Sequence, residues 1–246
     1  MNPKNVFVTT VAVLFVLAVA GCATRSISNS EVIPARTNSY CPEVTSSYKG
    51  ELSEFNVLGV HPNQTISEED IKSALSASKL IRFKPASRIL LIQSGAQFPD
   101  QPMITALSSA FSVSGFSGVP EETVTETSDY AKSLRLAAAR AGASGIVVYW
   151  GVLETGTENL VTKAVSWVPI VGGVLPDESQ KMRIRLKVAV IDVATGTWDM
   201  VYPEPHNDTA ASGYFTRYST DQGQVAKLKE VAYTGTATIL KARFVE

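Results

Sequence analysis

The chain has 246 residues, of which 45% are hydrophobic, and its 22 Lys and Arg against 23 Asp and Glu leave a net charge of −1. This length suffices for one large domain, and the lack of a basic excess argues against a nucleic-acid partner. The two histidines leave little room for a multi-histidine metal site, and no phosphate-cradling or zinc-binding motif occurs. The sequence therefore predicts no metal and no cofactor other than a covalent lipid.

That lipid is predicted from the first 21 residues, which have the three parts of a secretory signal. Lys4 supplies a positive charge, residues 6–20 are apolar, and small residues precede Cys22. The residues "VAGC" at positions 19–22 resemble the lipobox of bacterial lipoproteins. The resemblance implies that residues 1–21 are removed and that lipid on Cys22 anchors the chain to a membrane. Bacterial lipoproteins without an Asp directly after the lipidated cysteine are usually passed to the outer membrane, and here Ala23 follows Cys22. The resemblance therefore also implies the periplasmic face of an outer membrane.

Residues 22–50 are rich in Ser, Thr, Asn and Pro and lack periodic apolar positions, which predicts a lipidated, flexible tether. A single periplasmic α/β domain is expected over residues 51–246. Cys41 lies in the tether, and lipidation of Cys22 leaves it without a disulfide partner in the mature chain. We expect Cys41 to be a free thiol or to form an intermolecular disulfide.

Helix and strand patterns alternate in the first half of the domain. "FNVLGV" at residues 55–60 predicts a short strand, and the capping-box sequence at residues 67–70 predicts a helix over residues 68–79. The short continuous apolar run in "ASRILLIQSG", which ends in Ser-Gly, predicts a strand buried on both faces. Asp100 as a cap and Pro102 in the first turn then predict another helix.

The second half continues with a helix that begins near Ser128 and stops at Gly142, followed by a strand over residues 145–155. A strict period of two over residues 182–191 predicts a long strand, and Thr195 and Gly196 form the turn to a hairpin partner. Apolar spacing over the last 28 residues predicts a C-terminal helix on the sheet. The predicted fold is α/β (α+β), with a single mixed sheet of about five strands.

The phrases "AARAGASG", "IVVYWGVLET" and "VAVIDVATGTW" occur in this element order. Together they resemble a periplasmic α/β fold of bacterial lipoproteins. That fold is shared by lipoproteins related to the curli-secretion channel, by outer-membrane activators of penicillin-binding proteins and by auxiliary lipoproteins of transport systems. The resemblance covers about residues 87–202, and it implies a non-enzymatic part of an envelope assembly.

A connection between two strands, "SWVPIVGGVLP" at residues 166–176, is unexpectedly apolar. Connections are usually polar, so an exposed apolar patch here predicts a partner or membrane contact. The alternative is that the segment folds back onto its own core. The predicted contact residues are Trp167, Val168, Ile170, Val171, Val174 and Leu175.

A basic stripe recurs at every second position of the long strand, and it consists of Lys181, Arg183, Arg185 and Lys187. Such a stripe could meet phosphates, a glycan or an acidic partner. The favoured alternative is a solvated face that keeps the sheet from pairing edge to edge.

The sequence favours a non-catalytic binding or scaffold component of an envelope assembly or transport system. We expect a membrane contact through the lipid and an envelope protein partner or self-association. The competing hypothesis is an envelope hydrolase, such as a peptidase, with an unrecognised carboxylate or Ser site, so enzymatic activity stays open. Asp192 and Asp199 flank a hairpin turn, where polar residues usually serve the turn itself.

Overall fold

The computed structural model describes residues 23–29, 50–61, 65–77, 80–120, 129–159, 178–212 and 217–246. The signal sequence, Cys22, Cys41 and the predicted contact loop lie outside these residues. The chain divides into two compact units. The larger unit comprises residues 25–153, 183–207 and 225–246, and the smaller unit comprises residues 1–24, 154–182 and 208–224.

The strands form one mixed sheet with the order β3-β2-β4-β5-β6, in which β1 also pairs with β4 and β7 with β5. Strands β2, β3 and β4 are parallel to one another, and β5 and β6 are antiparallel. The α/β class and the single mixed sheet are confirmed, but the predicted number of about five strands is wrong, because the described residues alone form seven. The strands are β1 (Ala23–Ser26), β2 (Arg88–Gln93), β3 (Ser112–Phe116), β4 (Gly145–Asn159), β5 (Glu178–Asp192), β6 (Trp198–Val201) and β7 (His206–Ser212).

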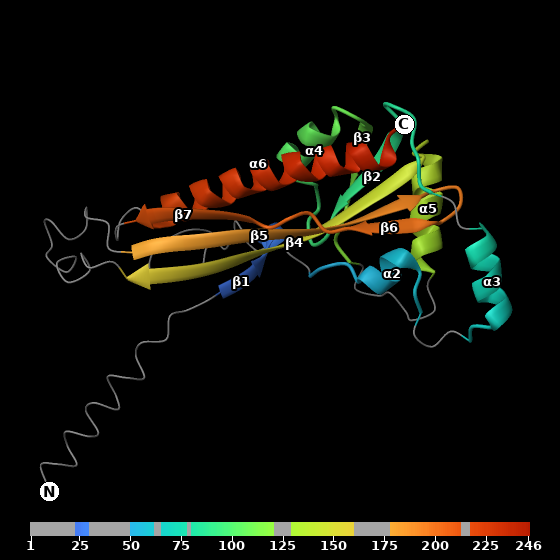
Figure 1. Ribbon diagram of the computed structural model, residues 1–246, viewed down its shortest axis with the longest axis horizontal. Helices are drawn as coiled ribbons and strands as arrows, with labels where there is room; N and C mark the ends of the chain where they lie inside the picture. Colours follow the sequence, from blue (N-terminus) through green and yellow to red (C-terminus); the bar gives the residue numbers. More distant parts are fainter. Residues whose placement is uncertain are drawn as a thin grey trace, which may run out of the picture. The chain divides into compact units, whose positions relative to one another are not determined.

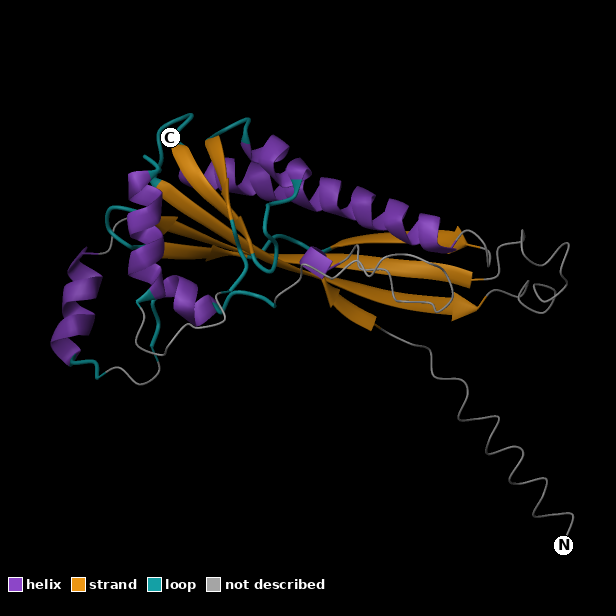
Figure 2. Cartoon of the chain, turned by 180° about the vertical axis from the view of Figure 1, so that it is seen from behind, coloured by secondary structure: helices purple, strands orange, loops and turns teal. Residues whose placement is uncertain are grey.

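The helices of the larger unit cover both faces of its sheet (Figures 1 and 2). Helices α4 and α6 lie on one face, and α2 and α5 lie on the other. The predicted C-terminal helix is confirmed. Of the helices in the described part of the chain, none combines the length and hydropathy needed to cross a bilayer. The helices are η1 (Ile27–Asn29), α2 (Glu54–Leu58), α3 (Glu68–Ala77), α4 (Gln101–Leu107), α5 (Tyr130–Arg140) and α6 (Arg217–Phe244).

The central strands are buried on both faces, as the apolar run in β2 predicts. Leu90 and Ile92 belong to the core cluster under α2 and α5, together with Leu134 of α5. Side chains alternate along a strand, so the intervening residues of β2 and β4 face the opposite layer. There Tyr149 of β4 meets Tyr233 of α6 edge to face, with ring centroids 5.8 Å apart. The sheet is therefore the middle layer of three.

The segment 55–60 is a correction to the sequence prediction, because it forms α2 and not a strand. Gly59 adopts a positive φ of 71° at the end of this helix, and the amide of Val60 donates to the carbonyl of Phe55 over 2.8 Å. A positive φ is inexpensive for glycine and stops the helix after five residues. Val57 is the residue that this single turn buries.

The described part of the smaller unit consists of the first two residues of β1, the end of β4, the start of β5, most of β7 and the start of α6. The side-chain amide of Gln224 on α6 donates to the carbonyl of Gln180 over 3.3 Å and to the carboxylate of Asp208 over 3.4 Å. These bonds connect the helix to β5 and β7 within this unit.

Part of the predicted tether is folded, because residues 23–29 form β1 and η1. The Ile27 side chain is only 1% exposed and lies over Gly151, where a Cβ atom would come within 2.8 Å of it. The hydroxyl of Ser28 donates to the carbonyl of Ser94 over 2.6 Å. The tether prediction is therefore wrong for these seven residues, and its remainder to residue 49 lies outside the described residues.

Replacing Ile27 tests whether this segment belongs to the folded domain. We expect Ile27→Ala to lower the free energy of unfolding by about 2–4 kcal/mol, because it leaves a cavity over Gly151. Chemical denaturation of the full chain measures this, with Thr24→Ala at an exposed position as the control. A loss below about 0.5 kcal/mol in Ile27→Ala would show that residues 23–29 do not stabilise the domain.

Candidate functional site

The sequence-predicted contact residues are only partly placed by the structure. Trp167, Val168, Ile170, Val171, Val174 and Leu175 lie outside the described residues, as does Cys22. The basic stripe lies on β5, where the predicted alternation is confirmed. Lys181, Arg183 and Arg185 are exposed, and they alternate with the buried residues Met182, Ile184 and Leu186.

Lys187, the last residue of the stripe, has a structural role. Its ammonium forms a salt bridge with Glu54 of α2 and lies 5.0 Å from the ring centroid of Trp150. The Trp150 indole in turn donates to the carbonyl of Leu52 over 2.9 Å. These contacts attach α2 and the segment before it to the sheet, so Lys187 differs in function from the exposed cations of β5.

The carboxylates that flank the β5–β6 turn are also used in the fold. Asp192 accepts from the amide and from the hydroxyl of Thr195, each over 2.7 Å. Asp199 pairs with Arg243 of α6 over 2.7 Å. The interpretation of Asp192 as a turn residue is confirmed. Among the described residues, no three His, Cys, Asp or Glu side chains gather in a way that could hold a metal ion.

A polar cluster that the sequence analysis missed lies where β2 ends and α4 begins. The side-chain carbonyl of Gln93 accepts from the Tyr149 hydroxyl over 2.5 Å and from the Asp100 amide over 2.7 Å. The Asp100 carboxylate accepts from the Tyr233 hydroxyl over 2.5 Å and pairs with Lys229 over 2.9 Å. Asp100 was predicted as a helix cap, but its side chain makes no cap bond and reaches α6 instead.

Burial in this polar cluster raises the pKa of both tyrosines well above the usual value, and the Asp100 charge adds to the effect. Both phenols therefore stay protonated and act as hydrogen-bond donors. Every polar side chain of the cluster is engaged with another, which suits a structural connection better than proton transfer. A polar Gln at the end of a buried apolar strand was the signal available in the sequence, because buried polar groups need partners.

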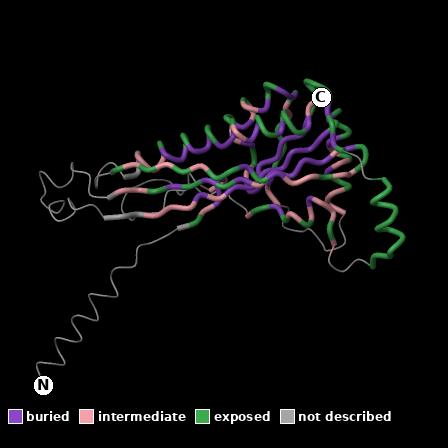
Figure 3. Tube along the Cα trace, viewed as in Figure 1, coloured by how far each residue is buried: buried purple, intermediate pink, exposed green. Residues whose placement is uncertain are grey.

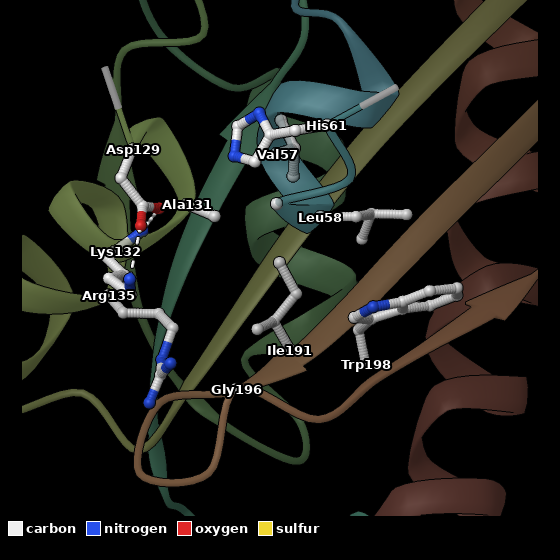
Figure 4. Close-up of a pocket in the computed structure, with 11 residues that line it drawn as sticks. Val57, Leu58, His61, Asp129, Ala131, Lys132, Arg135, Ile191, Gly196 and Trp198 are labelled. Atoms are coloured by element: carbon white, nitrogen blue, oxygen red, sulfur yellow. Dashed lines mark hydrogen bonds and ion pairs between the residues drawn. The ribbon is translucent and has the colours of Figure 1, made fainter. Parts of the chain in front are cut away.

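A cavity of about 240 Å³ opens on the face of α2 and α5 (Figure 4). Its walls come from α2, the first half of α5 and the β5–β6 hairpin. Figure 4 shows Lys132 and Arg135 of α5 on one side, Trp198 on the other and Ile191 between them. The lining residues are Val57, Leu58, Gly59, His61, Asp129, Ala131, Lys132, Arg135, Ile191, Gly196 and Trp198.

Helix α3 is exposed over its whole length (Figure 3). Its N-terminus is capped as predicted, because the hydroxyl of Ser67 accepts from the Asp70 amide over 3.1 Å and donates to the Asp70 carboxylate over 2.7 Å. The Ser67 amide also donates to the Asp70 carboxylate over 2.9 Å, and this bond, together with that from the Ser67 hydroxyl, lowers the pKa of the Asp70 carboxyl. None of the residues of α3 is buried, although Ile71 and Leu75 lie one turn apart on the same side. The helix therefore presents an apolar side that the described chain leaves uncovered.

A sequence that resembles a lipobox, followed by an α/β domain, is the pattern expected of a bacterial lipoprotein of the cell envelope. The chain belongs to the YafT bacterial lipoprotein family, whose model matches residues 53–243. It is thus a bacterial lipoprotein of the cell envelope, as the sequence predicts. No curated protein matches the chain.

Two solved structures illustrate how distant the structural relatives are. The PelC dodecamer from Paraburkholderia phytofirmans is 10% identical, with a TM-score of 0.23, and the match covers 62% of this chain and 92% of that one. The hypothetical protein CT253 from Chlamydia trachomatis is 11% identical, with a TM-score of 0.28 and coverages of 64% and 97%. Similarities this low support no further conclusion. The resemblance to curli-channel, activator and transport lipoproteins stays a prediction.

The polar cluster can be tested by removing its central carboxylate. Asp100→Ala leaves Lys229 without its partner and the Tyr233 hydroxyl without its acceptor. We expect a loss of about 2–4 kcal/mol in the free energy of unfolding, and about 1–2 kcal/mol for Tyr233→Phe. Denaturation curves should show less than additive losses in the double variant, while the exposed control Glu230→Gln stays unchanged. Additive losses would contradict a coupled cluster.

Proposed function

We propose that the protein is anchored in the outer membrane through lipid on Cys22 and that its periplasmic domain binds another envelope protein without catalysing a reaction. The anchor is supported by the "VAGC" motif and by Ala23 at the following position. Membership of the YafT bacterial lipoprotein family agrees with an envelope location. The binding role is supported by the exposed apolar side of helix α3.

The uncovered apolar side of α3 carries this proposal. The Ile71 side chain is 46% exposed and that of Leu75 is 72% exposed. Ile66 and Leu80, just outside the two ends of α3, are 62% and 84% exposed. A helix with an apolar side is stabilised mainly by burying that side, and an uncovered one is a typical element for docking into a partner's groove.

The charge of α3 favours a protein partner over the bilayer surface. Glu68, Glu69 and Asp70 form its first turn, and Lys72 is the one basic residue of the helix. Amphipathic helices that lie on membranes are usually rich in Lys and Arg, because anionic lipids at the membrane surface attract positive charge. An acidic helix is repelled by such a surface, whereas a protein groove with a basic rim complements it.

Two further contact regions are part of the proposal. The apolar loop with Trp167 and Ile170 is the first, for the sequence reasons given above. The exposed cations of β5 are the second, and an acidic partner would suit them. The competing hydrolase hypothesis gains no specific support from the described residues, because the carboxylates considered for it serve the turn and a salt bridge.

The role of α3 can be tested with Ile71→Gln and Leu75→Gln in one chain. Glutamine keeps the helix propensity but removes the apolar side. We expect the free energy of unfolding to change by less than about 0.5 kcal/mol, and a protein adduct from a photoreactive residue at Ser76 in living cells to fall about tenfold. Leu136→Gln, at a 53% exposed position of α5, is the matched control and should keep the adduct. Unfolding of the double variant, or an unchanged adduct, would refute docking through α3.

The apolar loop calls for its own crosslinking experiment. With a photoreactive residue at Trp167, we expect a discrete protein adduct, and Trp167→Ser combined with Ile170→Ser should abolish partner or self-association while the fold is kept. Mass spectrometry of the adducts identifies the partner. Adducts with lipid alone would make the loop a membrane contact, and unfolding of the double variant would place it in the core.

A further inference from the structure

The cavity between α2, α5 and the β5–β6 hairpin is rich in hydrogen-bond donors. Lys132 and Arg135 bring positive charges to its wall, and His61 and Trp198 bring ring N–H groups. Within the described chain, neither ring N–H makes a hydrogen bond. Trp198 is 43% exposed, so its indole can reach a ligand from solvent without moving the core. The cavity therefore offers donors that need acceptors.

Arg135 is held in place by the turn between β5 and β6. Its Nε donates to the carbonyl of Val193 and one terminal nitrogen donates to the carbonyl of Ala194, each over 2.9 Å. Both acceptors are uncharged, so among the described residues the guanidinium has no carboxylate partner. A Cβ atom added at Gly196 would lie only 2.5 Å from the other terminal nitrogen of Arg135, and the φ of 77° at this position also favours glycine. Glycine in the turn therefore makes room for the Arg135 guanidinium.

Among the lining residues that the structure describes, Asp129 is the single acidic side chain, and its charge is already compensated. Its carboxylate caps α5 by accepting from the Lys132 amide over 3.1 Å and pairs with the Lys132 ammonium over 2.7 Å. The same hydrogen bonds lower the pKa of the Asp129 carboxyl, with a smaller contribution from His61. Lys132 and Asp129 therefore cancel, and Arg135 leaves an excess positive charge at the cavity.

The remaining wall is apolar, with Val57, Leu58 and Ile191 beside the Trp198 ring. We propose that this cavity binds a carboxylate group carried on a short apolar stem, with the carboxylate at Arg135 and the stem against Ile191 and Trp198. Arginine suits such a group because its planar donors match the two oxygens. At about 240 Å³ the cavity is smaller than sites for whole drug-sized ligands, so it accommodates a terminal group.

Two sources supply this chemistry, namely the C-terminus of a polypeptide that ends in an apolar residue and a free small acid. The experiment uses the full lipidated chain in detergent micelles and isothermal titration calorimetry. The probes are an N-acetylated tripeptide ending in leucine, the same peptide with a C-terminal amide, and isovalerate. We expect the carboxylate peptide to bind at least about tenfold more tightly than the amide. Isovalerate binding as tightly as the peptide identifies a free acid, and weaker binding identifies a polypeptide terminus.

Variants separate this cavity from other surfaces. Arg135→Gln should raise the Kd by about tenfold, because it removes the proposed partner of the carboxylate. Lys132→Gln should raise the Kd by about threefold, because the Asp129 charge is then no longer compensated and repels the ligand. Arg135 also supports the turn, so thermal unfolding of its variant is measured in parallel, whereas the Lys132 side chain is 79% exposed and its loss spares the fold. Arg140→Gln, at an exposed position near the end of the same helix, is the matched control and should keep the wild-type Kd.

Three results would overturn the proposal. The first is equal affinity for the carboxylate and amide peptides, and the second is an unchanged Kd in Lys132→Gln. The third is a Kd above about 10 mM for both carboxylate probes. None of these depends on α3, so failure of the cavity and failure of the proposed partner docking are distinguishable.

Discussion

The carboxylate of Asp100 connects elements that are far apart in the sequence. It lies between β2 and α4, and it accepts from Tyr233 and Lys229 on α6, while the Asp100 amide reaches Gln93 at the end of β2. Lys229 and both tyrosines of the cluster are buried, so each of these groups requires its partner in order to be buried without a large cost. This requirement determines how the C-terminal helix packs on the sheet, because no other register of α6 would bring both side chains to the same carboxylate.

The opposite face of the sheet is organised differently, and the candidate binding features of the larger unit lie among its elements. There α2 is attached through Lys187 and Glu54, and Arg135 supports the β5–β6 turn beside the cavity. The Lys187–Glu54 ion pair on this face is more exposed than the Lys229–Asp100 pair of the polar cluster. A face with an accessible cavity suits a domain that presents surfaces to a ligand or partner. The lipid proposed on Cys22 would keep such surfaces near the membrane.

Elements with strong periodicity or clear caps were predicted correctly from the sequence. The alternation in β5, the apolar run of β2 and the capping box of α3 each depend on residues close in the chain. The prediction of a strand at residues 55–60 was wrong because Gly59 ends a helical turn whose single buried residue, Val57, packs on a surface made by distant residues. Strands β1, β3 and β7 were missed because they have weak apolar patterns and form by pairing with β4, β2 and β5 respectively.

The sequence by itself determined the lipoprotein class, the α/β composition and the order of the main helices and strands, because these depend on motifs and on local periodicity. Only the tertiary structure decided that Asp100 binds α6 and that Lys187 pairs with Glu54 of α2. It also decided that the described chain leaves the apolar side of α3 uncovered and that Arg135 lines a cavity with Trp198. These features join residues separated by many positions in the chain, and a single sequence carries no local signal for which polar group will meet which partner once the layers pack.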